Sequence, residues 1–201
     1  MKGVILVDSV TQLDREARGM VAVCGSHGGM YAAWVAARAG VRAVVLNDAG
    51  IGKHSAGIAG VLWLAGLDIP AVAIDHRSAR IGDGQDMMQS GIVSTVNDAG
   101  AKHGCLPGHT CKQVVKCLLE NSEESEAEIP EIGEARARIG NTGHREVWAI
   151  DSVSLARPED RRAILVTGSH GALLGGRPDH VLDVDVFAAF FNDAGGGKDG
   201  A

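Results

Sequence analysis

Aromatic residues and positive charge are both scarce in this chain of 201 residues. Trp, Tyr and Phe make up 3% of the sequence, so a hydrophobic core has to be built mainly from Val, Ile, Leu and Ala. The formal net charge is −6, and the basic residues form no cluster. Because proteins that bind nucleic acid usually carry a basic face, we expect no nucleic-acid partner.

Long apolar runs and disulfide patterns are also missing. Asp8 interrupts the first apolar run, which is too short for a signal peptide, and no window reaches the ~18 apolar residues of a membrane-spanning helix. Four Cys residues in a chain of this length do not indicate a disulfide scaffold, and the Cys-rich stretch 105–117 matches no common zinc pattern. The sequence therefore predicts a cytoplasmic protein with no membrane partner, metal or cofactor.

Glycine, in contrast, is abundant, with 28 residues, and one glycine motif occurs twice after an apolar run. "VAVCGSHGG" begins at Val21 and "ILVTGSHGA" begins at Ile164. The alignment extends further, since residues 7–28 and 150–171 align without a gap and ten of the 22 residues are identical. A second motif, "NDAGIGK" at 47–53, recurs as "NDAGGGK" at 192–198. Polar residues contribute little to a core, so their duplication suggests more than a copied scaffold.

The second copy is shorter than the first. After Lys53 the first copy continues through an Ala-rich stretch and a further apolar run, whereas only three residues follow Lys198. The sequence leaves open whether part of the second copy has been lost or whether another subunit supplies it. On this ground we expect a homo-oligomer that acts on a small-molecule substrate.

Short, nearly continuous apolar runs alternate with Ala-rich stretches along the chain. The runs lie at 3–7, 20–24, 42–46, 70–74, 146–150, 163–167 and 186–191, and helices are expected at 30–39, 55–67, 85–98 and 110–120. Such runs are typical of strands that are covered on both faces. We therefore predict an α/β fold with a Rossmann-like or flavodoxin-like, mostly parallel sheet and an internal, incomplete repeat.

The predicted organisation has three parts. Residues 1–119 form a first α/β repeat, and residues 146–201 form a partial second repeat that packs on the same sheet. Between them, residues 120–145 begin with "ENSEESEAEIPEIGE", which is acidic and has no apolar face. This composition predicts a linker or an exposed helix.

Polar side chains follow each of the first four predicted strands. They are Asp8, Ser26–His27, Asn47–Asp48 and Asp75–Arg77. In an open parallel sheet, ligands bind beyond the carboxyl ends of the strands, and neighbouring strands lie ~5 Å apart. We therefore expect these side chains to line one pocket.

The Gly-Ser-His-Gly turn holds the first candidate catalytic residues. Ser26 is a candidate nucleophile, and His27 is a candidate base that Asp8 or Asp48 orients. Because adjacent side chains tend to point apart, Ser26 is expected to use a histidine from elsewhere, such as His76. The alternative is structural: the serine caps the following helix and the histidine bonds only to the backbone.

Two glycine-rich turns are candidate anion sites. The amides of Gly28 and Gly29 precede a helix, and Lys53 follows glycines in a strand–turn–helix segment. The second turn is not a phosphate loop, because Asn47 and His54 stand where that signature needs Gly and Ser or Thr. An anion at the helix start is one interpretation, and a tight turn closed by the Asn and Asp side chains is the other.

The segment "DHRSARIGDG" at 75–84 carries two arginines in a loop that ends in glycine. Arg77 and Arg80 are candidates for a clamp on a substrate carboxylate. A solvated loop with internal ion pairs is the alternative.

Two of these motifs resemble those of caspase-type peptidases. His27 follows one strand in Ser-His-Gly, and Asp48 follows the next strand in Asp-Ala. In that family the nucleophilic Cys comes after Asp-Ala, and here that position is Gly50, or Gly195 in the copy. The resemblance therefore implies no cysteine peptidase activity. The whole pattern, including "SARIGD" at 78–83, also resembles a bacterial family of repeat proteins with duplicated GSHG and NDAG motifs, which implies no particular reaction.

The polar strand ends favour an enzyme, and we expect hydrolysis of an amide- or ester-like bond in a small anionic substrate. Two alternatives stay open, namely a non-catalytic ligand-binding or regulatory subunit and a nucleotide-binding protein that uses the Gly-Lys turn. The candidate catalytic residues are Ser26, His27, Asp48 and His76. The candidate substrate-binding residues are Asp8, Gly28, Gly29, Asn47, Lys53, Arg77 and Arg80.

Overall fold

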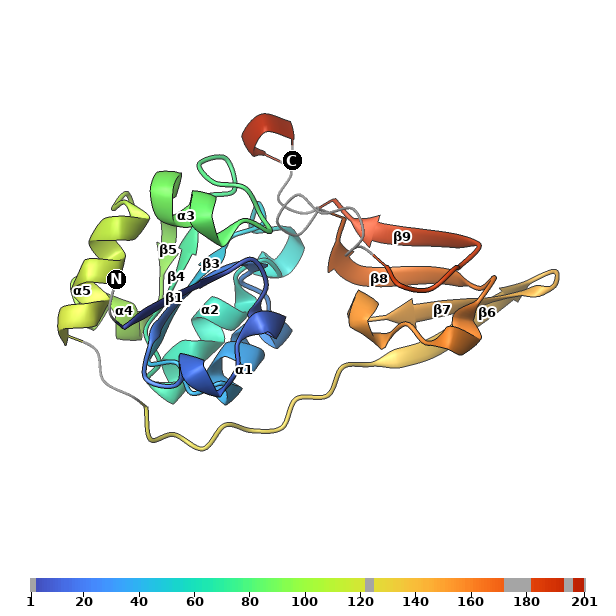
Figure 1. The fold of residues 1–201 in the computed structure, drawn as a ribbon, viewed down its shortest axis with the longest axis horizontal. Coiled ribbons are helices and arrows are strands. Elements are labelled where there is room, and N and C mark those ends of the chain that lie inside the picture. The colour runs from blue at the N-terminus through green and yellow to red at the C-terminus, as the bar shows by residue number, and fades with distance from the viewer. Residues whose placement is uncertain (1–2, 122–124, 172–181, 194–196, 201) are drawn as a thin grey trace. The chain divides into compact units, whose positions relative to one another are not determined.

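The computed structural model describes residues 3–121, 125–171, 182–193 and 197–200. Residues 122–124 of the predicted linker, and 172–181 and 194–196 of the second repeat, lie outside the described residues. The chain forms two compact units (Figure 1): unit 1 comprises Met1–Pro130 and Gly195–Ala201, and unit 2 comprises Glu131–Ala194. Within the described ranges, no helix has both the length and the apolar character needed to cross a membrane.

Unit 1 contains a five-stranded sheet whose strands lie side by side in chain order. They are β1 (Val4–Val7), β2 (Val21–His27), β3 (Ala43–Asn47), β4 (Ala71–Ile74) and β5 (Val93–Val96). β1 to β4 are parallel, and β5 is antiparallel to β4. The predicted α/β fold with a mostly parallel sheet is confirmed. Because the order does not reverse between β1 and β4, their carboxyl ends form one continuous edge.

Helices cover both faces of this sheet (Figure 1). On one face lie α1 (Met30–Arg38), α2 (Ala59–Trp63) and the short 3-10 helices η1 (Val10–Gln12), η2 (Arg15–Ala17) and η4 (Leu64–Leu67). On the other face lie α3 (Gly84–Ser90) and α5 (Cys111–Asn121). A further 3-10 helix, η3 (Lys53–Ser55), follows β3, and α4 (Asp98–Lys102) follows β5.

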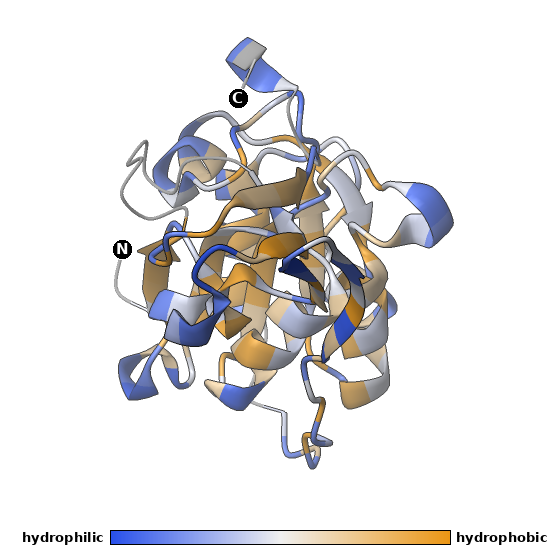
Figure 2. Ribbon diagram, turned by 90° about the vertical axis from the view of Figure 1, so that its right-hand side faces the viewer, coloured by the Kyte–Doolittle hydropathy of each residue, from blue (hydrophilic) through white to orange (hydrophobic). Residues whose placement is uncertain are grey.

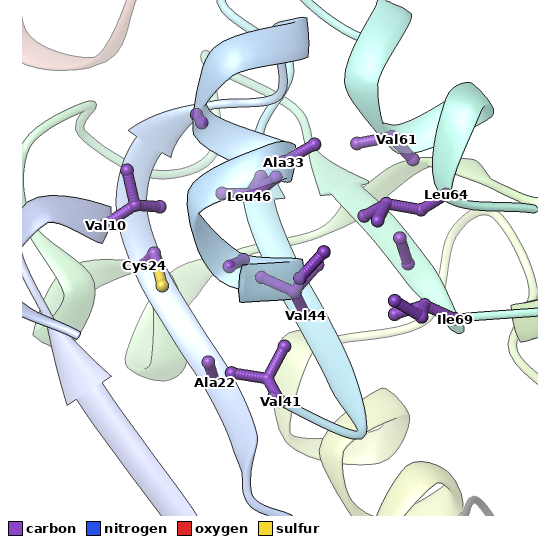
Figure 3. Packing of buried hydrophobic residues seen from close by; sticks show 14 of the residues in the cluster. Val10, Ala22, Cys24, Ala33, Val41, Val44, Leu46, Val61, Leu64 and Ile69 are labelled. Carbon is purple, nitrogen blue, oxygen red and sulfur yellow. The ribbon is translucent and has the colours of Figure 1, made fainter. Parts of the chain in front are cut away.

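The strand residues alternate between two apolar clusters. Ala22, Val44 and Leu46 point towards α1 and α2 (Figure 3), whereas Val23 and Val45 point towards α3 and α5. This period of two, with both faces buried, explains why the runs are apolar throughout. In Figure 2 the hydrophobic colour is accordingly concentrated on the strands and on the helix faces that cover them.

Small residues allow α1 and α2 to approach closely. A Cβ at Gly60 would lie 2.3 Å from the carbonyl oxygen of Gly29 and 2.5 Å from the Cβ of Ala33, so a larger residue would push the helices apart. The Ala-rich composition of α1 serves the same contact, because Ala33 and Ala36 are fully buried.

The helix predicted at 85–98 is wrong in its second half. The structure ends α3 at Ser90 and places β5 at 93–96, where "VSTV" has the β-branched residues that suit a strand. The third "NDAG", at 97–100, starts helix α4, because the Asn97 side chain caps the Gly100 amide. The same side chain also bonds to the backbone of Val61, Ile69 and Ala71, which ties α4 to the rest of the unit.

Unit 2 forms a separate four-stranded sheet in the order β6 (Arg136–Thr142), β7 (Arg145–Ile150), β8 (Ile164–His170) and β9 (Ala188–Asn192). The 3-10 helices η5 (Val153–Leu155) and η6 (Pro158–Asp160) lie between β7 and β8. The second repeat forms a sheet of its own, in which β6 pairs with β7 as an antiparallel hairpin. Its packing on the first sheet stays a prediction.

Within the described residues of the predicted linker at 120–145, β6 is the last complete element, and the segment before β6 is tied to unit 1. The Trp34 Nε1 donates to the Pro130 carbonyl at 2.8 Å, and the Ser125 hydroxyl donates to the Leu67 carbonyl at 2.5 Å. The acidic composition of the segment does not predict these hydrogen bonds.

The two sheets share the same pairing registers. Val4 pairs with Val21 in unit 1, and the matching residues Val147 and Ile164 pair in unit 2. After a bulge, His27 pairs with Asn47, and His170 pairs with Asn192. The internal repeat in the sequence therefore corresponds to a repeated three-stranded arrangement.

Candidate functional site

Hydrogen bonds join the loops that follow β3 and β4 at the carboxyl edge of the unit 1 sheet. Asp48 is the first residue after β3, and its backbone amide donates to the carbonyl of Ile74 at 2.8 Å. His76 follows β4 by two residues. Because β3 and β4 are parallel neighbours, the residues that follow each strand lie close together although they are far apart in sequence.

Asp48 is a buried carboxylate whose Oδ1 has three partners. It accepts the Gly50 amide at 2.9 Å and the His76 amide at 3.1 Å, and it lies 2.9 Å from the His76 Nδ1. The side chain is only 4% exposed. A carboxylate held in this way has a fixed orientation, and it fixes the imidazole that bonds to it.

His76 is partly open to solvent, with 26% of its side chain exposed. Its Nδ1 lies 2.9 Å from Asp48 Oδ1 and 3.5 Å from Asp75 Oδ1. A ring nitrogen that faces carboxylate oxygens carries a proton, so in the neutral imidazole the lone pair resides on Nε2. No other described residue makes a hydrogen bond to Nε2. A histidine with this contact can act chemically as a base that an aspartate orients.

Arg77, a candidate for the clamp on a substrate carboxylate, is paired with a carboxylate of its own loop. Its Nε and Nη2 donate to the two oxygens of Asp75 at 3.0 and 2.8 Å, and its side chain is otherwise exposed. Hydrogen bonds from Arg77 are the main reason that the pKa of Asp75 lies below its usual value, and the same pair raises the pKa of Arg77. The internal ion pair, which was the alternative interpretation, is therefore present.

The loop between Asp48 and α2 has a strained backbone. Positive φ angles occur at Gly50 and Gly52 and also at Ala49 (49°), Ile51 (66°), His54 (56°) and Ser55 (58°). Left-handed conformations are unfavourable for residues with a side chain and gather at functional sites. The predicted ligand Lys53 lies exposed in this loop. We call residues 49–55 the glycine loop.

Ser26 has a structural contact in place of the predicted catalytic one. Its hydroxyl accepts the Val10 amide at 3.0 Å, and the residue is buried. The matching residue of unit 2, Ser169, accepts the Val153 amide at 2.9 Å. The duplicated serine therefore connects the end of one strand to the 3-10 helix that follows the neighbouring strand in both units.

The turn after Ser26 uses its amides internally. The Gly29 amide donates to the His27 Nδ1 at 3.0 Å, and the Gly28 amide donates to the Asn47 carbonyl at 2.7 Å. The two glycines that were predicted to hold an anion are thus bonded within the protein. Burial lowers the pKa of His27, so this imidazole is neutral at pH 7.

Asn47 and Asp8, which were predicted to bind substrate, also bond to the backbone. The buried Asn47 side chain accepts the Ala49 amide at 2.9 Å and donates to the Ala79 carbonyl at 3.2 Å. Asp8 Oδ1 accepts the Gly84 amide at 3.1 Å. Each contact holds a loop against the carboxyl edge of the sheet, and the Asn47 contact is the one that the alternative interpretation of that turn expected.

Three donors in the described residues are close enough to hold a metal ion together. One ligand atom each from Asp48, Asp75 and His76 lie within 4.8 Å of one another. Two carboxylates and an imidazole suit Zn²⁺ or Mn²⁺. Here the same atoms bond to one another and to Arg77, so the protein satisfies them by itself.

Two further aspartates lie near these residues. Asp75 follows β4 directly and was expected at the polar edge, but it was not among the candidate catalytic or substrate-binding residues. Asp86 lies in α3 and accepts the Arg80 amide at 2.8 Å and the Ser90 hydroxyl at 3.0 Å. Nothing in the sequence pattern distinguishes Asp86 from other acidic residues, because its partners are set by the tertiary structure.

Comparison with protein-family models, curated proteins and solved structures found no match to this chain.

Proposed function

We propose that unit 1 is a hydrolase that cleaves an amide- or ester-like bond in a small charged substrate, with His76 as the general base. The observation that supports this proposal is the bond between His76 Nδ1 and the buried Asp48, which leaves Nε2 available at a partly exposed position. The strained glycine loop beside the pair adds support, since strain of this kind is typical of functional sites.

In the proposed reaction a water molecule is the nucleophile. His76 Nε2 removes a proton from the water as the water oxygen bonds to the carbonyl carbon. Asp48 accepts a hydrogen bond from the Nδ1–H group and stabilises the imidazolium that forms. The proton then passes from Nε2 to the leaving nitrogen or oxygen as its bond to the carbonyl carbon breaks. Ser26 has no part in these steps, because its hydroxyl bonds to the Val10 amide.

The negative charge on the carbonyl oxygen needs a positive partner. We assign this role to Lys53, whose side chain is exposed on the glycine loop. Gly50 of the same loop lies beside the imidazole, since a Cβ at this position would be 3.7 Å from His76 Nε2. The loop is therefore next to the atom that accepts the proton.

The test is an assay of His76→Gln and Asp48→Asn on p-nitrophenyl esters and p-nitroanilides of small carboxylic and amino acids. We expect either change to lower kcat/KM by roughly 10² to 10⁴. The control is His103→Gln at the end of α4, which should leave the rate unchanged. A wild-type protein that cleaves none of these substrates, or a His76→Gln variant with full activity, would contradict the proposal.

A second candidate is hydrolysis assisted by a divalent cation, and the three clustered donors favour it. Asp75→Asn separates the two candidates, because it removes one possible ligand and leaves the His76–Asp48 pair in place. With a general base, this variant keeps most of its activity and EDTA has no effect. With a metal ion, both treatments abolish activity, and Mn²⁺ or Zn²⁺ restores it to the wild type after EDTA.

The other sequence-based expectations stay predictions. They are a cytoplasmic location, the lack of a nucleic-acid partner and the two non-hydrolytic alternatives. For nucleotide binding, the Asn47 side chain already closes the turn that a phosphate would occupy. A thermal-shift measurement with ATP and NAD tests this alternative, and a rise in Tm would support it.

The predicted homo-oligomer is supported by exposed apolar residues on unit 2. Val166 and Phe190, which pair across β8 and β9, are 39% and 59% exposed. The matching pair in unit 1, Val23 and Val45, is fully buried under α3 and α5. Light scattering after size exclusion tests the prediction, and Phe190→Lys should shift the mass towards that of one chain.

A further inference from the structure

A short segment near the end of the chain lies on unit 1, although by sequence it belongs to the second repeat. It comprises Gly197 and the 3-10 helix η9 (Lys198–Gly200). The segment contacts the loop between β4 and α3, which carries His76, Arg77 and Arg80. Its position beside the proposed general base is the starting point for the inference.

Lys198 binds the carboxylate of Asp86 with both oxygens. The Nζ lies 2.6 Å from Oδ1 and 2.8 Å from Oδ2, and the two side chains are 21% and 11% exposed. Burial alone would raise the pKa of Asp86, but the bonds from Lys198, the Arg80 amide and Ser90 outweigh it, so the pKa lies below its usual value. The carboxylate is thus charged, and the Arg80 amide and the Ser90 hydroxyl also hold it in place.

A second ion pair lies next to the first, and in this pair the segment supplies the anion and the loop supplies the cation. The Arg80 guanidinium donates to the carboxylate of Asp199, and its Nη1 lies 3.8 Å from Asp86 Oδ2. The loop and α3 therefore present an anion, Asp86, beside a cation, Arg80. The segment places the cation Lys198 on the first and the anion Asp199 on the second. Lys198 and Asp199 are consecutive in the segment. A ligand with the same two charges in the reverse order would place each of them against a group of like charge.

The backbone of the segment passes directly against His76. A Cβ at Gly197 would lie 2.7 Å from His76 Cδ2, 3.1 Å from the His76 carbonyl oxygen and 3.3 Å from Arg77 Cγ. Only glycine fits at this distance without moving the imidazole. A peptide group is thereby placed beside the proposed base, while the next two side chains reach Asp86 and Arg80.

We infer that Arg80 and Asp86 form a recognition site for a ligand that carries an ammonium group and a carboxylate on a peptide-like backbone, and that Gly197–Asp199 occupies it as an internal ligand. The inference rests on the proposed hydrolase and names its substrate class as short peptides or amino-acid amides with both charges. It replaces the expectation of a small anionic substrate, because the carboxylate of Asp86, which is 11% exposed, selects a cation.

The first repeat contains a natural comparison for this ligand. Its Gly-Lys pair, Gly52–Lys53, is followed by His54, whereas Lys198 is followed by Asp199. A peptide with the first sequence has the ammonium group but lacks the carboxylate that Arg80 binds. It should therefore bind more weakly than a peptide with the second sequence.

The test uses the full-length chain with Lys198→Ala and Asp199→Ala together, which frees the site without shortening the protein. The probe is the capped peptide Gly-Gly-Lys-Asp-Gly, and binding is measured by calorimetry. We expect binding to the double variant, and at least tenfold weaker binding to the wild type because its own segment competes. The matched control breaks the exposed Lys102–Asp68 pair with two alanines, which should leave binding at the wild-type level.

Changes in the peptide test the two charges without altering the protein. Replacing its Lys by norleucine, or its Asp by Asn, removes one charge-assisted bond and should weaken binding by roughly 10- to 100-fold. The Gly-Gly-Lys-His-Gly peptide should show the same loss as the Asn peptide. Absence of binding to the double variant, or equal affinity for all four peptides, would overturn the inference.

The outcome is separate from that of the proposed hydrolase. Binding of the Lys-Asp peptide to the double variant, with no cleavage of any ester or amide substrate by the double variant or the wild type, supports the recognition site and rejects the hydrolase. Cleavage of simple esters without any peptide binding rejects the recognition site and leaves the hydrolase in place. Release of the segment should also raise kcat/KM for peptide substrates in the double variant.

Discussion

The role of Ser26 gives the sharpest test of the structural interpretation. Sequence reasoning made this residue a candidate nucleophile, whereas the structure bonds its hydroxyl to the Val10 amide. Ser26→Ala removes the acceptor and leaves the amide in a buried position, because Val10 is only 4% exposed. We therefore expect a loss of stability and no loss of catalysis.

The magnitude follows from the burial of the amide. A buried N–H group without a partner costs about 1 to 3 kcal/mol. For a unit of this size, each kcal/mol corresponds to roughly 3 to 5 °C in Tm, so the melting temperature of unit 1 should fall by roughly 3 to 15 °C. The matching change in unit 2, Ser169→Ala, should cost less, because Ser169 is partly exposed and water can replace its hydroxyl.

Two measurements distinguish the structural role from the catalytic one. Urea denaturation gives the free energy of unfolding, and amide hydrogen exchange followed by NMR reports on Val10 itself. We expect faster exchange at Val10 in Ser26→Ala, with kcat/KM per folded protein unchanged. If the variant lost its hydrolytic activity while its stability and Val10 exchange stayed at wild-type values, Ser26 would be a catalytic residue and our reasoning would be refuted.

Three further predictions concern pH, thiol reactivity and packing. Burial alone would raise the pKa of Asp160, but bonds from Arg136 and from a backbone amide hold it below the usual 3.8. The stabilisation of unit 2 by this pair is therefore present above pH 3.8 and is lost as the pH falls through the lowered value, which circular dichroism should show for the wild type and not for Asp160→Asn. Burial raises the pKa of Cys111 to about 12, so the thiol should react with DTNB at pH 8 only after unfolding. Gly60→Ala should cost about 1 to 3 kcal/mol in urea denaturation, because its Cβ would meet the Gly29 carbonyl and the Ala33 side chain, whereas Gly66→Ala, with open space around it, should cost little.

The positions of the strands could be predicted from the sequence because the signal is local. A strand buried on both faces must be apolar throughout, so the runs at 20–24 and 42–46 already mark β2 and β3. The same holds for the repeat, which appears in the sequence and recurs in the strand registers. The error at 85–98 arose where a polar helix and a short strand follow each other without an apolar run to separate them.

The use of each polar side chain could not be predicted in this way. The sequence placed Asp48 and His76 at strand ends, but it gave the same weight to Ser26, Gly28 and Gly29. Their hydrogen bonds go to atoms of neighbouring loops, such as the Val10 amide and the Asn47 carbonyl. Those partners are fixed only when the strands pair, so residue type and position are not enough to separate structural from chemical roles.

What the sequence by itself determined is the position of β1 to β4 and of β7 to β9, the shared polar edge of the first four strands and the duplicated unit, because hydrophobic periodicity acts over a few residues. Only the tertiary structure decided that His76 bonds to Asp48, 28 residues away, and that Asp86 faces Lys198, 112 residues away. Hydrogen bonds and ion pairs are short-range and directional, so they depend on the final packing of segments that are distant in sequence.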